Sequence, residues 1–352
     1  MFNPNPVAGE LEPSNHSSRS GWSPDRIGTD HGTDISTRQL AAGMNGWLSL
    51  TTVLALAITP LLGAQSRAED TRVEIEHLGS SAYHLRVTDS AGVTNLLASL
   101  GSEGALLVDH LGDWRTRIPD TVQARVIREA MARVHPAPLR FLVNTHAHGD
   151  HTGGNEIHGA TAVIIAHAGT RAALREPDPF GGTAGRLMAE DGLPTLSFED
   201  SLTLHLNGET IRLVHFGPAH TRGDLVAFFD HEDAVHMGDL FSGFHSPPVG
   251  DLGGLLRTYD QVARRVGAAT RIVTGHGGVE SQRDLIAYAG AIRAAADSVR
   301  ARMSRGLAFE AIQQLGLPPF EGRTWSPRLQ TTMLTQIHRA LARGEELGAP
   351  RS

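Results

Sequence analysis

The amino-acid sequence predicts an α/β fold in which two β-sheets pack face to face and helices cover their outer surfaces. Short strand-like segments and amphipathic helices follow one another from Val73 onward, and they come in two successive sets. Elements arranged in this way bury their apolar faces as stacked layers. Apolar residues make up 40% of the 352 residues, which is enough for a large core.

The first set of elements lies between residues 71 and 175. Its predicted strands are short, apolar and separated by Gly, Ser and Asp. They cover residues 71–78, 82–89, 94–100, 105–111, 139–146 and 161–167. The apolar spacing predicts a helix over 119–135, with Asp120 as its N-cap, and another near 168–175.

The second set begins near residue 201 and extends to the C-terminal region. Strands are predicted at residues 201–207, 209–216, 224–230, 233–239 and 271–277. The first two are joined by a tight "NGE" turn. Helical patterns cover residues 254–267, 281–304, 307–315 and 327–346.

Composition and charge exclude several classes of function. The net charge of -7 and the pI near 6.2 argue against a nucleic-acid-binding protein, which would carry a basic patch. We therefore expect a small-molecule substrate, and nothing in the sequence specifies an oligomeric state. Because the chain has no cysteine, a transition-metal site would have to use histidine and carboxylate ligands. Such ligands suit zinc, iron or manganese.

The N-terminal part differs in composition from the rest of the chain. Residues 1–43 are rich in Gly, Ser, Asn, Pro and Asp, which predicts disorder, or a true start of translation at Met44. Residues 44–68 contain an uncharged apolar run from Trp47 to Ala64, typical of a secretory signal peptide. We therefore expect an exported protein, periplasmic or secreted. An uncleaved anchor in the inner membrane is the alternative.

The stretch "NTHAHGDHTGGN", residues 144–155, concentrates histidine and aspartate where a predicted strand ends. His146 and His148 are two residues apart, so on an extended turn both imidazoles can reach one metal ion. Asp150 and His151 follow directly and can point to a second ion. The flanking glycines allow a tight backbone path. We expect a helix to begin after this loop, with the ligands near its N-terminus.

Three further candidate ligands follow apolar strands later in the chain. His220 comes after a Gly-Pro turn in "FGPAHTRGD". Asp239 lies in "HMGDLF", and His276 lies between glycines in "TGHGG". One side chain of ligand type at the end of each strand is the pattern of a site built on a rigid scaffold.

Together with Asp109 in "LLVDH", these residues resemble the metallo-β-lactamase fold superfamily over about residues 73–290. The matching residues, in the order of the family, are Asp109, His146, His148, Asp150, His151, His220, Asp239 and His276. The resemblance implies an αββα four-layer sandwich, with two mixed sheets and outer helices. This domain would cover residues 69–300, and a C-terminal helical extension would cover residues 301–352.

The resemblance also implies two divalent metal ions, zinc in the first instance, with iron or manganese as alternatives. The ligands of the first ion would be His146, His148 and His220. The ligands of the second ion would be Asp150, His151 and His276, with Asp239 bridging the two ions. Asp109 would order the ligand loop from behind.

The implied activity is hydrolysis of a carbonyl bond in a lactone, ester, thioester or β-lactam by a hydroxide that bridges the two ions. Two metals roughly 3.5–4 Å apart can clamp the attacking and leaving oxygens. Asp150, His220 and Asp239 are the residues expected at the reaction centre. One alternative is an iron-dependent sulfur dioxygenase of the same fold, which would use a single iron and fewer ligands. The other is a non-catalytic metal-binding accessory protein.

Several polar residues near these motifs are candidates for supporting roles. Arg222 and Asp224, just after His220, and His245, in the loop after Asp239, are predicted to support a ligand or to face the substrate. The glycine-rich segment 177–188 is predicted to be a lip over the metals or a plain surface loop. His205, His215 and His236 alternate with apolar residues in predicted strands and are expected to be partly buried and hydrogen-bonded. His158 and His167 are expected to be structural.

Overall fold

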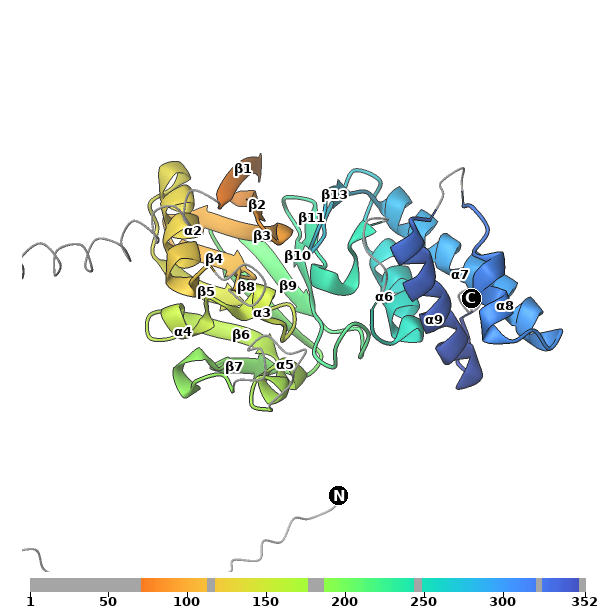
Figure 1. The fold of residues 1–352 in the computed structure, drawn as a ribbon. Coiled ribbons are helices and arrows are strands. Elements are labelled where there is room, and N and C mark those ends of the chain that lie inside the picture. Colours follow the sequence, from red (N-terminus) through yellow and green to blue (C-terminus); the bar gives the residue numbers. More distant parts are fainter. Residues whose placement is uncertain (1–70, 113–117, 177–186, 244–248, 321–324, 348–352) are drawn as a thin grey trace, which may run out of the picture. The chain divides into compact units, whose positions relative to one another are not determined.

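The computed structural model describes residues 71–112, 118–176, 187–243, 249–320 and 325–347. In this part the chain forms two mixed β-sheets with helices on their outer faces (Figure 1). The predicted α/β sandwich of two mixed sheets is therefore confirmed.

The first sheet has seven strands in the order β1-β2-β3-β4-β5-β6-β7. The strands are β1 (Arg72–Gly79), β2 (Ala82–Asp89), β3 (Gly92–Gly101), β4 (Gly104–Val108), β5 (Leu139–Val143), β6 (Val163–His167) and β7 (Leu196–Phe198). β1 to β4 pair antiparallel, and β4 to β7 pair parallel. Parallel neighbours need long crossovers. These crossovers contain α2 (Asp120–Val134), α3 (Gly149–Thr152), α4 (Asn155–His158), α5 (Ala168–Ala173) and the 3-10 turn η1 (Glu190–Gly192).

The second sheet has six strands in the order β13-β12-β11-β10-β9-β8. They are β8 (Ser201–Leu206), β9 (Glu209–Val214), β10 (Val226–Phe229), β11 (Ala234–His236), β12 (Arg271–Val273) and β13 (Val279–Glu280). All neighbours are antiparallel except β11 and β12. Asn207 and Gly208 join β8 to β9 with φ values of 56° and 76°, which is the backbone of the predicted tight hairpin turn.

Four helices lie on the outer side of the second sheet (Figure 1). They are α6 (Leu252–Ala263), α7 (Gln282–Ser304), α8 (Phe309–Leu315) and α9 (Pro327–Ala342). Met333 and Ile337 of α9 share one apolar cluster with Val235 of β11. α9 therefore packs with α6 and α7 on this side of the sheet, and α8 packs against α7 and α9.

Two further apolar clusters complete the layers. Ile127 and Met131 of α2 pack on Leu96 and other residues of the first sheet. Between the sheets, Leu97 of β3 and Leu213 of β9 belong to a common cluster. Three clusters thus join four layers, and the central strands β3 and β4 are buried on both faces.

The structure corrects some details of the sequence predictions. α2 begins at Asp120 with Pro119 as the N-cap residue, so the prediction that Asp120 is the N-cap was wrong. Asp120 instead lies in the first turn, where a carboxylate is favoured by the helix dipole. The strands β7 and β13 were not predicted, because three and two residues are too few to show an alternating pattern.

The predicted signal segment, residues 44–68, lies outside the described residues, as do residues 1–43. Among the residues that the structure describes, no helix combines the length and the hydropathy needed to cross a bilayer.

Candidate metal centre

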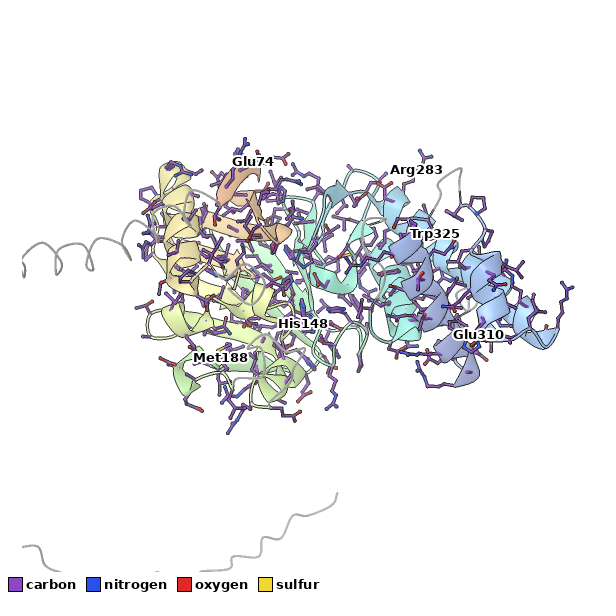
Figure 2. All side chains as sticks on the ribbon, in the orientation of Figure 1. Glu74, His148, Met188, Arg283, Glu310 and Trp325 are labelled. Carbon is purple, nitrogen blue, oxygen red and sulfur yellow. The ribbon has the colours of Figure 1, made fainter. Side chains whose placement is uncertain are left out.

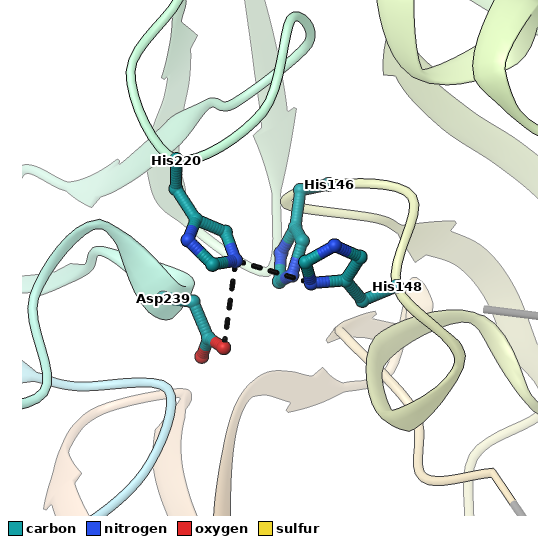
Figure 3. A group of neighbouring side chains, drawn as sticks. All are labelled: His146, His148, His220 and Asp239. Carbon is teal, nitrogen blue, oxygen red and sulfur yellow. Dashed lines mark hydrogen bonds and ion pairs between the residues drawn. The ribbon is translucent and has the colours of Figure 1, made fainter. Parts of the chain in front are cut away.

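Seven histidine and aspartate side chains gather beyond the ends of strands β5, β9, β11 and β12. They form two neighbouring groups, and within each group the candidate ligand atoms lie within 4.8 Å of one another. The first group is His146, His148, His220 and Asp239 (Figure 3). The second group is Asp150, His151 and His276. The structure therefore brings together all seven residues that the sequence singled out, and their binding of ions stays a prediction.

The histidine-rich loop leaves β5 and turns at once into the short helix α3. His148 is the N-cap of this helix, and Asp150 and His151 lie within it. The expected helix thus begins inside the ligand stretch and not after it. In Figure 2, His148 lies apart from Glu310 of α8 and from Trp325, which precedes α9.

Asp109 anchors this loop from behind. It follows β4, is fully buried, and has a φ of 65°. Its carboxylate accepts the Thr145 N–H at 2.7 Å, the Thr145 hydroxyl at 2.8 Å and the His151 Nδ1–H at 2.8 Å. These contacts are the ones expected of a residue that orders metal ligands.

Four of the five histidines have Nδ1 next to an acceptor, which leaves Nε2 to face the site. The acceptors are Thr145 Oγ1 for His146 (3.0 Å), Asp109 for His151, the Val249 carbonyl for His220 (3.1 Å) and the Val93 carbonyl for His276 (2.8 Å). A proton on Nδ1 selects the neutral tautomer whose Nε2 lone pair can bind a metal.

His148 presents the other ring nitrogen. Its Nδ1 lies 3.1 Å from Nε2 of His220 (Figure 3). Since Nδ1 of His220 donates to the Val249 carbonyl, its Nε2 carries the lone pair. The two nitrogens therefore face a common point between them.

Asp239 stands between the two groups. Its Oδ2 lies 3.7 Å from Nε2 of His220 in the first group. Its Oδ1 lies 3.3 Å from Nε2 of His151 and 3.4 Å from Nε2 of His276 in the second group. One carboxylate oxygen faces each group, which is the arrangement required of a bridging ligand.

The donor atoms fit divalent metal ions. Three of them, His146 Nε2, His151 Nε2 and Asp239 Oδ1, are buried without a hydrogen-bond partner among the described residues. An unsatisfied buried polar atom costs about 1–3 kcal/mol. Ligand atoms around a tetrahedral ion at ~2.1 Å would lie about 3.4 Å apart. The ion-pair distances between donors of the site, 3.2 to 3.9 Å, match that spacing.

The carboxylates and imidazoles of the second group are strongly coupled. Burial lowers the pKa of His276, but the carboxylates of Asp239 and Asp150 outweigh it and raise that pKa to about 10. Burial raises the pKa of Asp150, but His151 and His276 outweigh it and lower that pKa to about 2. Without ions, protonated imidazoles therefore neutralise the carboxylates, and bound cations would replace those protons.

The loops that carry the ligands approach one another too closely for side chains at two glycines. A Cβ on Gly275 would lie 2.1 Å from Oδ1 of Asp239. A Cβ on Gly238 would lie 2.5 Å from Oγ1 of Thr145, and Gly238 has a φ of 52°. Glycine at both positions is what lets the ligands of both sheets meet.

Asp224 builds the turn that carries His220. Its buried carboxylate accepts the Thr221 N–H at 2.8 Å, the Thr221 hydroxyl at 2.6 Å and the Ala219 N–H at 3.2 Å. These bonds fix the backbone on both sides of His220. Of the two roles predicted for Asp224, the structure favours support of a ligand.

Other candidates lie away from the seven side chains or outside the described residues. Arg222 is exposed, and its side chain makes no hydrogen bond or ion pair to another described residue. His245 and residues 177–186 lie outside the described part of the chain. His205 is exposed on β8, so the prediction that it is partly buried was wrong. β8 is an edge strand, where one face remains open to water.

Sequence reasoning missed Asn95 and gave His236 only a structural role. Both are fully buried behind the site. The signal for Asn95 was a lone amide inside the apolar strand "GVTNLLASL". A buried amide in such a strand needs hydrogen-bond partners, which here come from the ligand loops.

Comparison with known proteins agrees with this geometry. The chain is 28% identical over 173 residues to a hydroxyacylglutathione hydrolase of Synechococcus sp. (strain JA-2-3B'a(2-13)), covering 45% of this chain and 60% of that protein. It is 29% identical over 163 residues to the 2,4-dinitroanisole O-demethylase subunit alpha of Nocardioides sp. (strain JS1661), covering 45% and 44%. The chain thus spans about half the length of the curated relatives that it matches.

The solved structure of metallo-beta-lactamase IND-7 has a similar fold. Its TM-score is 0.50 at 16% identity, and the match covers 62% of this chain and 95% of that one. The sequence model of the metallo-beta-lactamase superfamily matches residues 88–276, from β2 to the last of the seven side chains. With these residues, this fold and this family match, the chain belongs to the metallo-beta-lactamase superfamily.

Proposed function

We propose that this protein is a hydrolase that uses two divalent ions, zinc in the first instance, to cleave a carbonyl bond of a small molecule. The observation that carries the proposal is the position of Asp239, with one carboxylate oxygen toward each group of donors. Bound there, two ions would lower the pKa of a water molecule and polarise a carbonyl group.

The side chains of the site have different proposed roles in binding the ions and in orienting the ligands. His146, His148 and His220 offer neutral nitrogens, which leave a bound cation electrophilic. Burial raises the pKa of Asp150, but His151 and His276 lower it to about 2 in the ion-free site, so its carboxylate is a weak proton acceptor there. We therefore assign Asp150 mainly to ligation. The bond from His151 to Asp109 keeps the imidazole ring oriented when substrate enters.

The substrate class follows from carbonyl chemistry and from the relatives. Lactones, esters, thioesters and β-lactams all react through attack on a carbonyl carbon. One curated relative is a hydroxyacylglutathione hydrolase, which supports including thioesters among the candidates. Metal content distinguishes the single-iron dioxygenase alternative, in which the second group of ligands would have no role.

The test is a panel of one chromogenic cephalosporin, one nitrophenyl ester, one thioester and one lactone. The zinc-loaded protein is compared with its His148→Ala variant. We expect turnover of at least one class by the native protein and loss of more than about 100-fold in the variant. Turnover that persists in the variant, or none for the whole panel with two ions bound, would contradict the proposal.

We also propose that the protein is exported. The uncharged apolar run from Trp47 to Ala64 supports this. The N-terminus of the protein recovered outside the cytoplasm should lie within or just after residues 64–68. Recovery of the intact apolar segment in the membrane fraction would favour an anchor.

A further inference from the structure

Two buried polar residues behind the site belong to neither group of candidate ligands. Asn95 lies in β3 of the first sheet, and His236 is the last residue of β11 in the second sheet. Both side chains are fully buried. A polar group in such a place is retained only when its hydrogen bonds are made.

Asn95 binds the backbone around His276. Its N–H donates to the Gly275 carbonyl at 2.9 Å, and its Nδ2 donates to the Thr274 carbonyl at 3.0 Å. Nδ2 also lies 3.4 Å from the Gly277 carbonyl. Asn95 thus contacts carbonyls on both sides of His276.

A third residue fixes the orientation of this amide. Nε2 of His84, on the neighbouring strand β2, lies 3.0 Å from Oδ1 of Asn95. With Oδ1 accepting from His84, the Nδ2 donors must point toward the 274–277 loop. The amide cannot flip without losing contacts at both ends.

His236 extends the same network to Asp239. Its Nε2 donates to the backbone carbonyl of Asn95 at 2.9 Å. Its Nδ1 accepts the Gly238 N–H at 3.1 Å, one residue before Asp239. The neutral tautomer with its proton on Nε2 satisfies both bonds. The two ligand loops are joined directly as well, because the Gly275 N–H donates to the Gly238 carbonyl at 2.8 Å.

We propose that Asn95 and His236 form a positioning pair that sets Asp239 and His276 relative to each other, and so controls the affinity of the second metal ion. This inference rests on the proposed two-metal site. The first group has other supports, since Asp109 and Thr145 hold the His146 loop and Asp224 holds the His220 turn. Asp239 contacts both groups, whereas His276 belongs to the second group alone. Disturbing the pair should therefore weaken the second ion more than the first.

The test uses nearly isosteric changes. Asn95→Asp keeps the shape but places an oxygen against the carbonyls of Thr274 and Gly277. His236→Leu removes the acceptor for the Gly238 N–H, whereas His236→Asn retains an oxygen near the position of Nδ1. Ser99→Ala is the matched control, because Ser99 is a buried polar residue of the same strand, bonded to Ser81 and Asn207.

Zinc stoichiometry and affinity are measured by equilibrium dialysis, and the cobalt-substituted proteins are compared by visible absorption. We expect the native protein and Ser99→Ala to bind two ions. Asn95→Asp and His236→Leu should weaken the second ion about 10- to 100-fold and the first ion less. His236→Asn, which keeps the acceptor for the Gly238 N–H but loses the donor to the backbone carbonyl of Asn95, should lie between His236→Leu and the native protein. The unfolding temperature in chelator serves as the check on folding.

Distinct results would overturn each proposal. If the native protein binds two ions and both variants keep native affinity, or weaken both ions equally, the positioning role is wrong. If Asn95→Asp does not fold, the comparison of His236→Leu with His236→Asn decides alone. If the native protein binds fewer than two ions, the two-metal site and the positioning role both fail.

Discussion

At Asp239 a single carboxylate faces both groups of candidate ligands. Its oxygens lie 3.3 to 3.7 Å from imidazole nitrogens of His151, His220 and His276. Its replacement therefore tests the two-ion geometry most directly.

Asp239→Ala should lose at least one of two ions and more than about 100-fold of the activity, because each group loses an anionic donor. Metal analysis after dialysis measures this. His205→Ala, which alters an exposed edge-strand histidine, should keep native metal content. Full occupancy in Asp239→Ala would show that the carboxylate does not bridge.

Zinc uptake at pH 7 should release protons. The pKa of His276 is raised to about 10 by Asp239 and Asp150, so its imidazole is protonated at pH 7 before an ion binds. In the ion-free protein this raised pKa contributes stability that is present below pH ~6.5 and lost as pH rises through about 10. Because an ion must displace the proton from His276, zinc affinity should fall as pH falls. Calorimetric titration in two buffers of different ionisation heat measures the release, and equal heats would contradict it.

The ligand loops leave the strands so close together that backbone packing decides whether the site can form. Gly275 is the tightest example, since Oδ1 of Asp239 occupies the space of a side chain. Such an approach is set by strand ends from different parts of the chain. It therefore belongs to the arrangement of elements and not to any one ligand.

Gly275→Ala should destabilise the fold by about 1–3 kcal/mol and weaken metal binding, because the added methyl group must displace Asp239. Chemical denaturation and metal analysis measure the two effects. Gly267→Ala is the control, since its nearest neighbour, Thr270 Oγ1, lies 3.9 Å from the added atom. If the two variants have the same free energy of unfolding and the same metal content, the loops accommodate the methyl group of Gly275→Ala without loss of stability.

Strand-end motifs singled out the seven side chains that the structure brings together, because each of them follows an apolar strand that is recognisable locally. A single sequence does not show the position of a strand in its sheet. His205 and His236 both alternate with apolar residues, yet one is exposed on edge strand β8 and the other is buried on β11. Asn95 was missed for the same reason, since its partners in residues 274–277 lie in the loop that follows β12 of the other sheet.

Across the whole molecule, the candidate ligands are divided between the two sheets. The loop after β5 of the first sheet supplies His146, His148, Asp150 and His151. Loops after β9, β11 and β12 of the second sheet supply His220, Asp239 and His276. Bound ions would therefore join the sheets, and their binding energy would add to the stability of the sandwich.

Removal of the ions should lower the unfolding temperature by about 5 to 10 °C for each site, because one site at 100-fold excess over Kd contributes about 2.7 kcal/mol. Differential scanning calorimetry of the zinc-loaded protein with and without chelator measures this. The shift should shrink in His148→Ala. An unfolding temperature that is independent of zinc would contradict the expected link between the sheets.

The separation of the ligands along the chain sets when an ion can be acquired. His146 and His276 are distant in sequence and meet only after both sheets have formed. An emerging or unfolded polypeptide thus offers only the candidate ligands of residues 144–155. The complete set of seven side chains comes together only in the folded protein. If the chain crosses a membrane before folding, its choice of metal would be made by the ions available at its destination, and not by those of the cell interior where it was synthesised.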